Sequence, residues 1–447
     1  MKTIFGTDGI RGVANQYPMT AEVALSVGRA LAHLFRNGHK PRFLIGKDTR
    51  LSGYMIEMAL ASGICSMGAD VLLIGPMPTP GIAFLTQAMR ADAGVMISAS
   101  HNPFQDNGIK IFDRYGFKLS DEKELEIERL MDSGDLDKLR PTAEKIGKAF
   151  RVEDAAGRYI EFLKSSFPKE LSLEGMKIVV DCADGATYHI APTIFQELGA
   201  EVFVLGEKPD GRNINETGAV HPKRMTEEVI RSKADVGIAL DGDGDRVVFA
   251  DEGGRVVDGD AILAVCAEEL LRQGKLKHKT AVVTVMSNRS LENYINVSGG
   301  RILRTAVGDR YVVEKMREGG FNFGGEPSGH IVFLDYATTG DGLIAALQVM
   351  ATMRLRGKRL SEIVTGYHAL PQILTSVKVS GRRDLAQVPE VQKMIREFEN
   401  DLGTQGRVLV RYSGTEPLIR IMVEGPEDSL IGRMAKDLSK CIQKNLS

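Results

Sequence analysis

Five short segments of the chain combine Gly with Ser, Asp, His or Arg, the residue types that hold phosphate groups and divalent cations. They are Gly-Thr-Asp-Gly-Ile-Arg-Gly (residues 6–12), Ala-Ser-His-Asn-Pro (99–103), Asp-Gly-Asp-Gly-Asp-Arg (241–246), Gly-Glu-Pro-Ser-Gly-His (325–330) and Arg-Tyr-Ser-Gly-Thr-Glu-Pro (411–417). Each lies between apolar runs, as do loops whose backbone approaches a ligand closely. Together they indicate one site for a phosphorylated, hydroxyl-rich substrate and a divalent cation.

The strongest metal signal is the alternation of Asp241, Asp243 and Asp245 with glycines. Glycine lets such a loop curl, so three carboxylates can converge on one hard cation. An EF-hand is the rival interpretation, because Glu252 stands at its twelfth position. However, Arg246 occupies the sixth position, where an EF-hand needs Gly, and the flanks look like strands. We therefore expect an open-sided Mg²⁺ site; a solvated acidic turn is the alternative.

Ser100 follows a strand-like run at residues 95–98, so its hydroxyl is expected at a strand end, a usual place for chemistry on α/β sheets. The Asn102-Pro103 pair forces an extended or turn backbone beside it. A Ser-His pair alone is weak evidence for a nucleophile, and the Gly-x-Ser-x-Gly elbow of hydrolases is absent here. From the residues alone, Ser100 is either a group carrier or a turn serine.

Two further segments offer ligand-binding groups. Residues 411–417 supply hydroxyls, a glycine and Arg411, and Arg420 follows on the next apolar run. Such groups suit a phosphate dianion, although a tight hairpin with a capping serine is the alternative. Residues 325–330 supply a carboxylate, a hydroxyl and an imidazole, which can bind sugar hydroxyls or move protons, or can simply form a turn.

The segments are embedded in a repeated strand-helix-strand pattern. A short buried strand at 42–46, a helix at about 55–66 and a strand at 68–75 form one unit, and similar units recur at 177–206 and 281–305. Helical spacing over 20–36, with Thr20 as cap, predicts a further helix. The pattern indicates three related α/β domains with mixed sheets.

The C-terminal part differs from the rest. Residues 374–380, 407–412 and 418–424 read as strands, and a helix is expected over about 427–443. This order favours a smaller α+β domain with an antiparallel sheet, beginning near Pro371. The expected domains are residues 1–152, with the serine segment, 153–253, with the Asp segment, 254–369, with the Glu-Pro-Ser segment, and 370–447.

Composition narrows the class of protein. The net charge of −2 gives no reason to expect a nucleic-acid or membrane-surface partner. The four cysteines have no metal-type spacing, which is typical of reduced thiols in a cytosol. The N-terminus has no signal-peptide pattern, and the longest uncharged run, 71–89, contains prolines and glycines unlike a membrane helix. We expect a cytoplasmic protein.

With the five segments in this order, the whole chain resembles the α-D-phosphohexomutase superfamily. Within it, the chain is most similar to the bacterial members that interconvert glucosamine 6-phosphate and glucosamine 1-phosphate, toward UDP-N-acetylglucosamine and cell-wall synthesis. That finer resemblance depends on the first motif lying at the extreme N-terminus and on Val-Gly-Asp-Arg-Tyr-Val at 307–312. Phosphoglucomutase/phosphomannomutase activity is the alternative, and a metal-dependent phosphatase and a non-catalytic sugar-phosphate sensor are others.

The resemblance implies four domains in a heart-shaped molecule around a central cleft. It implies that Ser100 is phosphorylated in the resting enzyme and gives its phosphoryl group to the substrate. The implied cofactors are Mg²⁺ and a bisphosphate activator, glucosamine 1,6-bisphosphate or glucose 1,6-bisphosphate. The implied partner is a small sugar phosphate, with neither nucleic acid nor membrane, and a homodimer is left open.

The resemblance also assigns roles to individual residues. Asp241, Asp243 and Asp245 would bind Mg²⁺ together with a phosphoserine oxygen on Ser100. The catalytic neighbours would be Arg11, His101, Lys110, Arg246 and His330, with Lys110 or His330 as candidates for proton transfer. The substrate contacts would be Glu326 and Ser328 for sugar hydroxyls, and Arg411, Ser413, Gly414, Thr415 and Arg420 for the non-reacting phosphate.

One position departs from the family pattern. Related chains usually carry Gln or Met between the Glu and Ser of the sugar segment, whereas this chain carries Pro327. Proline fixes φ and removes an N–H group. If that N–H normally contacts the ligand or the loop, sugar preference or loop mobility would differ.

Overall fold

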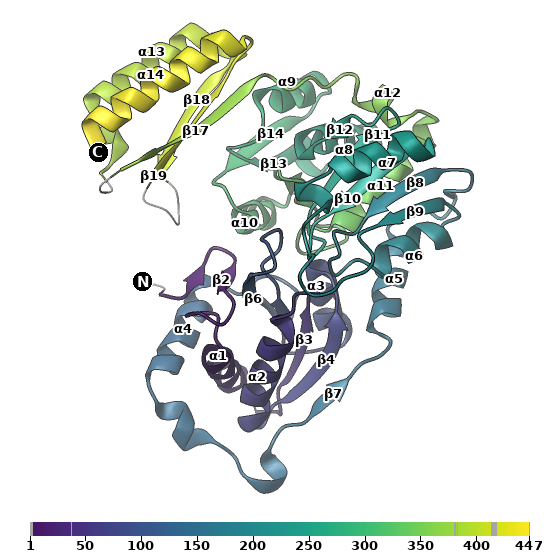
Figure 1. Ribbon diagram of the computed structural model, residues 1–447, viewed down its shortest axis with the longest axis vertical. Coiled ribbons are helices and arrows are strands. Elements are labelled where there is room, and N and C mark those ends of the chain that lie inside the picture. Colours follow the sequence, from purple (N-terminus) through teal and green to yellow (C-terminus); the bar gives the residue numbers. More distant parts are fainter. Residues whose placement is uncertain (1–2, 37, 380, 382, 413–417, 447) are drawn as a thin grey trace. The chain divides into compact units, whose positions relative to one another are not determined.

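The computed structural model describes residues 3–36, 38–379, 381, 383–412 and 418–446, and it divides into two compact units (Figure 1). Unit 1 comprises Met1–Met286 and Ile302–Val364, and unit 2 comprises Ser287–Arg301 and Thr365–Ser447. Unit 1 contains three sheets, with helices packed against them, and unit 2 contains one sheet. The expected multi-domain α/β architecture is therefore confirmed.

The first sheet of unit 1 has seven strands in the order β1-β2-β6-β5-β3-β4-β7. Its central strands β3, β4 and β5 run parallel, and β6 and β2 continue the sheet antiparallel. The strands are β1 (Phe5–Gly6), β2 (Gly9–Val13), β3 (Arg42–Lys47), β4 (Asp70–Pro76), β5 (Ala93–Ile97), β6 (Asp106–Asp113) and β7 (Ala149–Arg151). The helices of this region are α1 (Ala21–Leu34), α2 (Gly53–Ser66), α3 (Thr79–Ala88) and α4 (Asp121–Asp132).

The apolar run of β3 explains why this sheet is covered on both faces. Phe43 and Ile45 pack in one core with α1 and α2, while Leu44 points to the opposite face, along which α3 lies. All three side chains have no exposed surface. A strand buried on both faces reads as a continuous rather than an alternating apolar run, as sequence analysis expected for this segment.

The second sheet of unit 1 has the order β12-β11-β10-β8-β9, and the third has the order β14-β13-β15-β16. The predicted strand-helix-strand elements appear at the expected residues, although the helix between β13 and β14 belongs to unit 2. The strands are β8 (Lys177–Asp181), β9 (Glu201–Leu205), β10 (Val236–Leu240), β11 (Val247–Asp251), β12 (Val256–Val257), β13 (Thr280–Thr284), β14 (Arg301–Thr305), β15 (Phe323–Gly325) and β16 (Ile331–Phe333). The helices are α5 (Ala155–Ser165), α6 (Ile190–Glu197), α7 (Lys223–Ser232), α8 (Gly259–Arg272), α10 (Asp309–Gly319), α11 (Gly342–Arg356) and α12 (Leu360–Val364).

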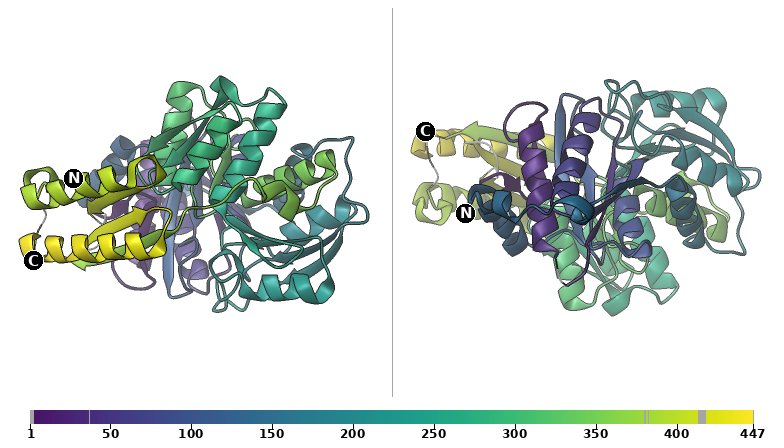
Figure 2. Two further views of the ribbon diagram at one scale, coloured as in Figure 1. Left: turned by 90° about the horizontal axis from the view of Figure 1, so that it is seen from above. Right: turned by 90° about the horizontal axis from the view of Figure 1, so that it is seen from below.

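Unit 2 contains the predicted antiparallel sheet, in the order β17-β19-β18. Two helices lie side by side over one face of it (Figures 1 and 2). The elements are β17 (Gln372–Lys378), β18 (Arg407–Tyr412), β19 (Leu418–Glu424), α9 (Arg289–Val297), α13 (Pro389–Leu402) and α14 (Asp428–Leu446). Sequence analysis placed the three strands and α14 but missed α13.

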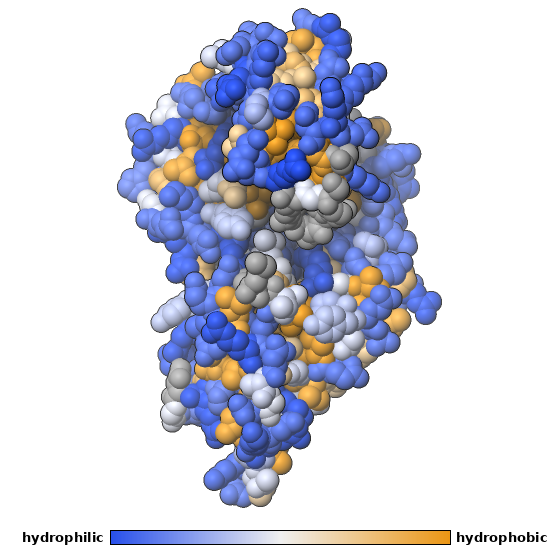
Figure 3. Space-filling view, turned by 90° about the vertical axis from the view of Figure 1, so that its left-hand side faces the viewer, coloured by the Kyte–Doolittle hydropathy of each residue, from blue (hydrophilic) through white to orange (hydrophobic). Residues whose placement is uncertain are grey.

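One face of the molecule shows how hydrophilic and hydrophobic side chains are distributed. On the face drawn in Figure 3, hydrophilic side chains predominate and hydrophobic ones lie scattered among them. Within the described ranges, no helix is both long enough and apolar enough to span a bilayer.

Helices α1 and α2 are in direct backbone contact through a pair of glycines. A Cβ atom on Gly63 would lie 2.2 Å from the carbonyl oxygen of Leu25, and one on Gly28 would lie 2.4 Å from that of Leu60. Distances below about 3 Å are not tolerated by real Cβ atoms, so each substitution would push the helices apart. The two glycines therefore set how closely α1 and α2 pack under the first sheet.

We predict that Gly63→Ala destabilises the protein by roughly 1–3 kcal/mol, the usual cost of forcing an extra methyl group into a filled interior. Thermal unfolding followed by calorimetry measures the effect as a lower Tm. Gly157→Ala in α5 is the matched control, because a Cβ there meets nothing within 4 Å. Alanine is a better helix former by about 1 kcal/mol, so this control is expected to be neutral or stabilising. Equal Tm values for the two variants would contradict the prediction.

Candidate active site

Ser100 lies just beyond the carboxyl end of β5, as the sequence predicts. Its hydroxyl donates a hydrogen bond to Oδ2 of Asp241, 2.8 Å away, and its Oγ lies 3.5 Å from Nδ1 of His101. Ser98, two residues earlier, has other partners: its hydroxyl donates to Asp48 (2.6 Å) and accepts from the backbone N–H of Ser100 (2.9 Å). Of the two serines, Ser100 is the one whose hydroxyl faces the acidic loop.

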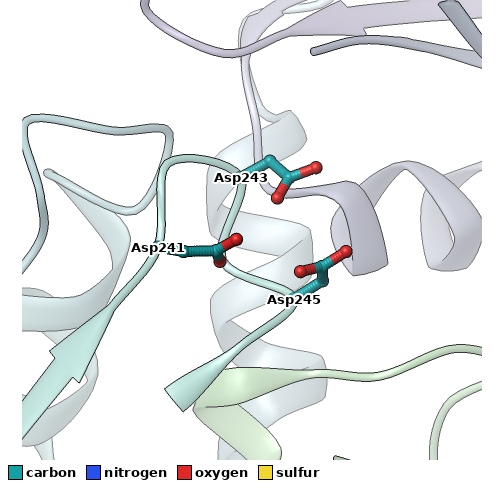
Figure 4. Close-up of side chains that lie close together, drawn as sticks. All are labelled: Asp241, Asp243 and Asp245. Carbon is teal, nitrogen blue, oxygen red and sulfur yellow. The ribbon is translucent and has the colours of Figure 1, made fainter. Parts of the chain in front are cut away.

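The acidic loop is the connection of a β-hairpin. β10 and β11 pair antiparallel with Leu240 opposite Val247, so residues 241–246 form the turn. Gly244 adopts a φ of +70°, a left-handed conformation that glycine accepts without strain. Figure 4 shows the three carboxylates of Asp241, Asp243 and Asp245 turned toward a common space. Since strands flank the loop and Glu252 accepts hydrogen bonds from Ser361, the EF-hand alternative is excluded.

The donor set of this loop fits a hard divalent cation. One carboxylate oxygen from each Asp lies within 4.8 Å of the others, and all three side chains are buried. The Oδ1 atoms of Asp243 and Asp245 have no hydrogen-bond partner among the described residues. Buried carboxylate oxygens without partners are costly unless a cation binds them, and Mg²⁺ prefers such oxygen ligands.

Lys110 compensates part of this negative charge. Its buried ammonium group donates to Oδ2 of Asp243 at 2.8 Å and lies 3.4 Å from Asp8 and 3.6 Å from Asp245. Burial disfavours the charged lysine, but these carboxylates outweigh burial and raise the pKa of Lys110. Conversely, burial would raise the pKa of Asp243, but Lys110 and a hydrogen bond from Thr79 (2.6 Å) lower it. Lys110 is therefore held as a cation.

The pKa of Asp241 is shifted in the opposite direction from that of Asp243. Burial and the neighbouring carboxylates of Asp245 and Asp243 raise its pKa well above the usual range. His101, by contrast, has its pKa lowered to about 4, first by burial and then by the positive charge of Arg246. His101 is consequently neutral at physiological pH and can serve as a hydrogen-bonding group beside Ser100.

A row of alternating charges links Lys110 to the sugar segment. Asp8 pairs with Arg11 (2.6 Å), Lys110 (3.4 Å) and Lys118 (2.5 Å). Lys118 also donates to Asp309, whose carboxylate lies 3.5 Å from Nε2 of His330. The network joins the first sheet to the third. Asp8 and Asp309 lie within the sequence motifs described above, which indicate no role for either residue, and no sequence pattern marks Lys118.

The segment 325–330 is the turn between β15 and β16. The N–H of Glu326 donates to the carbonyl of His330 (3.0 Å), and that of Gly329 donates to the carbonyl of Glu326 (3.1 Å). The turn therefore closes without an N–H at Pro327. Burial raises the pKa of Glu326, whose Oε1 accepts from the N–H of Gly308 at 3.1 Å.

His330 and Arg246 have buried nitrogen atoms that are available to bind a ligand. Neither ring nitrogen of His330 has a hydrogen-bond partner among the described residues, although the side chain is buried. Nε of Arg246 is likewise buried without one, and its guanidinium lies 3.9 Å from Asp245. Ser328 is exposed on the turn. Among the described residues of unit 1, the predicted site residues thus lie together, except that Ser328 forms no hydrogen bond or ion pair with the others.

In unit 2, Arg411 and Arg420 are direct cross-strand neighbours on β18 and β19. Burial and the charge of Arg420 lower the pKa of Arg411. Like charges placed opposite each other on a sheet repel, and an anion relieves that repulsion. Ser413, Gly414 and Thr415, also predicted to hold phosphate, lie outside the described residues.

Comparison with known proteins finds four matching family models, which cover most of the chain in order. They are the phosphoglucomutase/phosphomannomutase alpha/beta/alpha domains I (residues 2–138), II (157–254) and III (258–369) and the C-terminal domain (374–440). A phosphoglucosamine mutase of Geobacter sp. strain M21 is 59% identical, covering 100% of this chain and 99% of the relative. The phosphoglucosamine mutase of Syntrophotalea carbinolica is 57% identical, with coverage of 100% and 98%.

Solved structures agree at the level of the fold. A phosphoglucomutase/phosphomannomutase family protein of Burkholderia thailandensis has a TM-score of 0.80 at 25% identity, covering 99% of this chain and 97% of its own. N-acetylphosphoglucosamine mutase of Aspergillus fumigatus, solved with GlcNAc-6P and magnesium, has a TM-score of 0.67 at 21% identity, covering 100% and 96%.

The raised pKa of Asp241 predicts a pH dependence of cation binding. Below that pKa the carboxyl is protonated, so a proton competes with the cation; above it, three ionised carboxylates repel one another and destabilise the cation-free protein. The increase in Tm caused by Mg²⁺ is therefore expected to grow as pH rises from about 5 to about 8. Thermal shift with Mg²⁺ or chelator across this range measures it. Asp241→Asn should flatten the dependence; an increase in Tm that shrinks with rising pH would contradict the prediction.

Proposed function

Because the chain belongs to the phosphoglucomutase/phosphomannomutase family and is a phosphohexomutase, an isomerase, we propose that it interconverts glucosamine 6-phosphate and glucosamine 1-phosphate. This phosphoglucosamine mutase activity is supported by relatives of that name at 57–59% identity over the full chain. One observation carries the proposed chemistry: the Ser100 hydroxyl lies 2.8 Å from a carboxylate of the buried acidic triad. This proximity supports Ser100 as the phosphoryl carrier and the acidic triad as the cation site of the proposed reaction.

In the proposed reaction, phosphorylated Ser100 is the donor. The free sugar hydroxyl forms a bond to phosphorus while the bond from Ser100 Oγ to phosphorus breaks, and the hydroxyl proton passes to a base. The product is glucosamine 1,6-bisphosphate. This intermediate rotates in the site so that its other phosphate is transferred back to Ser100. Glucosamine 1,6-bisphosphate or glucose 1,6-bisphosphate would activate an unphosphorylated enzyme.

Mg²⁺, held by Asp241, Asp243, Asp245 and a phosphate oxygen on Ser100, would neutralise charge on the transferring group. Lys110 would stay a cation near the same group and stabilise its developing charge. We assign proton transfer to His330, since Lys110 is ion-paired with carboxylates, whereas neither ring nitrogen of His330 forms a hydrogen bond among the described residues. Positioning and charge neutralisation suffice for phosphoryl transfer, which needs little covalent help from protein.

The remaining substrate contacts are proposals of the same kind. Glu326 and Ser328 would bind sugar hydroxyls or the amino group, with Arg11, His101 and Arg246 bordering the phosphoserine. Arg411 and Arg420, with Ser413, Gly414 and Thr415, would hold the non-reacting phosphate. The four domain ranges, the cytoplasmic location and a homodimer stay predictions.

The decisive experiment compares kcat/KM for glucosamine, glucose and mannose 1- or 6-phosphates under the same bisphosphate activation. We predict a preference for the glucosamine phosphates without absolute exclusion of glucose, because replacing the amine by a hydroxyl still leaves a hydrogen-bonding group. Equal or better values for glucose or mannose would move the chain to phosphoglucomutase/phosphomannomutase activity. Net phosphate release would indicate a phosphatase, and binding without turnover a sensor.

Ser100→Ala is predicted to abolish mutase turnover, because no hydroxyl remains to carry the phosphoryl group. Its Tm should match that of the wild type, which calorimetry checks. Peptide mapping by mass spectrometry should place the phosphate of the wild-type protein on Ser100. Phosphate found only on Ser98, together with an active Ser100→Ala variant, would refute the assignment.

A further inference from the structure

The backbone of Ser100 is in a conformation that it would not adopt by itself. Its φ is +51°, in the left-handed region that residues other than glycine rarely occupy. Such a conformation costs on the order of 1–3 kcal/mol and persists only where the surroundings hold it. The segment must therefore be held by specific contacts.

Two buried side chains supply those contacts. Arg50 donates to the carbonyl oxygens of Ser100 (2.8 Å) and Asn102 (2.7 Å), and Asn215 donates through Nδ2 to the same two oxygens at 2.8 and 3.0 Å. Arg50 is completely buried and is paired with Asp48 at 2.8 Å. Because Asp48 also accepts from Ser98, Arg50 anchors the serine segment within the first sheet.

Asn215 makes a third contact that Arg50 does not make. Its Oδ1 accepts a hydrogen bond from the backbone N–H of Gly242, 2.8 Å away, in the acidic loop of the second sheet. The fit is tight, since a Cβ atom on Gly242 would lie 2.7 Å from Nδ2 of Asn215. One amide group therefore joins the loop that carries Ser100 to the loop that carries the three carboxylates.

We propose that Asn215 is a positioning residue that holds the serine segment and the acidic loop at the separation that phosphoryl transfer requires. The inference rests on the proposed function. The short contact between Ser100 and Asp241 joins two loops from different sheets, so it depends on whatever fixes these loops relative to each other. Asn215 bonds both loops, and an error of about 1 Å in such a placement can cost roughly 100-fold in rate.

The variant Asn215→Gly tests the side-chain amide separately from the backbone conformation. Asn215 itself has a φ of +64°, which glycine adopts freely, so the variant loses the side chain without adding strain. Asn215→Asp keeps an oxygen for Gly242 but replaces the donor by a carboxylate facing two carbonyl oxygens. Asn213→Gly is the matched control, because the side chain of Asn213 bonds Lys208 and Asp210 within its own loop.

We expect kcat of Asn215→Gly to fall roughly 10- to 100-fold, with KM for the sugar phosphate changed by less than about threefold. Asn215→Asp should be impaired at least as much, and Asn213→Gly should match the wild type. An Asn215→Gly enzyme with wild-type kcat, or one whose loss lies in KM alone, would overturn the inference. A wild-type enzyme without mutase turnover would instead overturn the proposed function.

A second measurement does not depend on turnover. Calorimetry of Mg²⁺ binding to the Ser100-phosphorylated and unphosphorylated forms gives the gain in affinity that the phosphate provides. In Asn215→Gly that gain should shrink, because the phosphate and the carboxylates are no longer held together, while the affinity of the unphosphorylated form should stay close to that of the wild type. An equal gain in both proteins would show a merely structural role and overturn the proposal.

Discussion

The burial of three carboxylates on one hairpin turn is the constraint on which the rest of unit 1 depends. Ionised Asp241, Asp243 and Asp245 cannot share a buried space without counter-charge, because like charges in a medium of low polarity repel strongly. The protein supplies a lysine on β6 and a threonine at the start of α3, both directed at Asp243. Among the described residues, the Oδ1 atoms of Asp243 and Asp245 have no hydrogen-bond partner, which favours a cation rather than a closed ion-pair network.

The need to balance buried charge also explains the arrangement of the charged residues around the acidic loop. Asp8 follows β1, Lys118 lies beyond β6, and Asp309 begins α10, so the charge row crosses from the first sheet to the third. Asp8 lies between Lys110 and Lys118, Lys118 lies between Asp8 and Asp309, and each of these side chains is at most partly exposed. At the far end of the charge row, Asp309 lies 3.5 Å from Nε2 of His330, so the row reaches the turn at residues 325–330.

Features fixed by neighbouring residues were predictable from the sequence. β8, β18 and β19 fall at the predicted residues because their apolar runs are compact and end at polar residues or glycine. The signal for α13 was present but overlooked: Val391, Ile395, Phe398 and Leu402 recur at helical spacing and pack into the core of unit 2. The roles assigned to individual site residues depend on ligands and stay predictions.

Contacts between segments that are distant in the chain could not be predicted from the sequence. Nothing in the residues around Lys118 or Asn215 marks them, because their importance comes from what the tertiary fold places against them. Asn215 lies in a polar stretch that reads as an ordinary loop, and its partners are backbone groups, whose positions no side-chain pattern records. Acidic Asp8 and Asp309 lay inside motifs already noted, yet only the structure pairs them with one shared lysine.

The buried position of Lys118 between Asp8 and Asp309 limits how freely parts of this chain can be exchanged with those of relatives. A chimera that takes its third-sheet region from a protein with a neutral residue at the Asp309 position would leave an ammonium group with half its counter-charge in a largely buried site. Recombination would succeed where the crossover carries the carboxylate along with its lysine. Because of the charge row, a substitution at one of these charged positions requires a compensating substitution in a segment that is distant in the sequence.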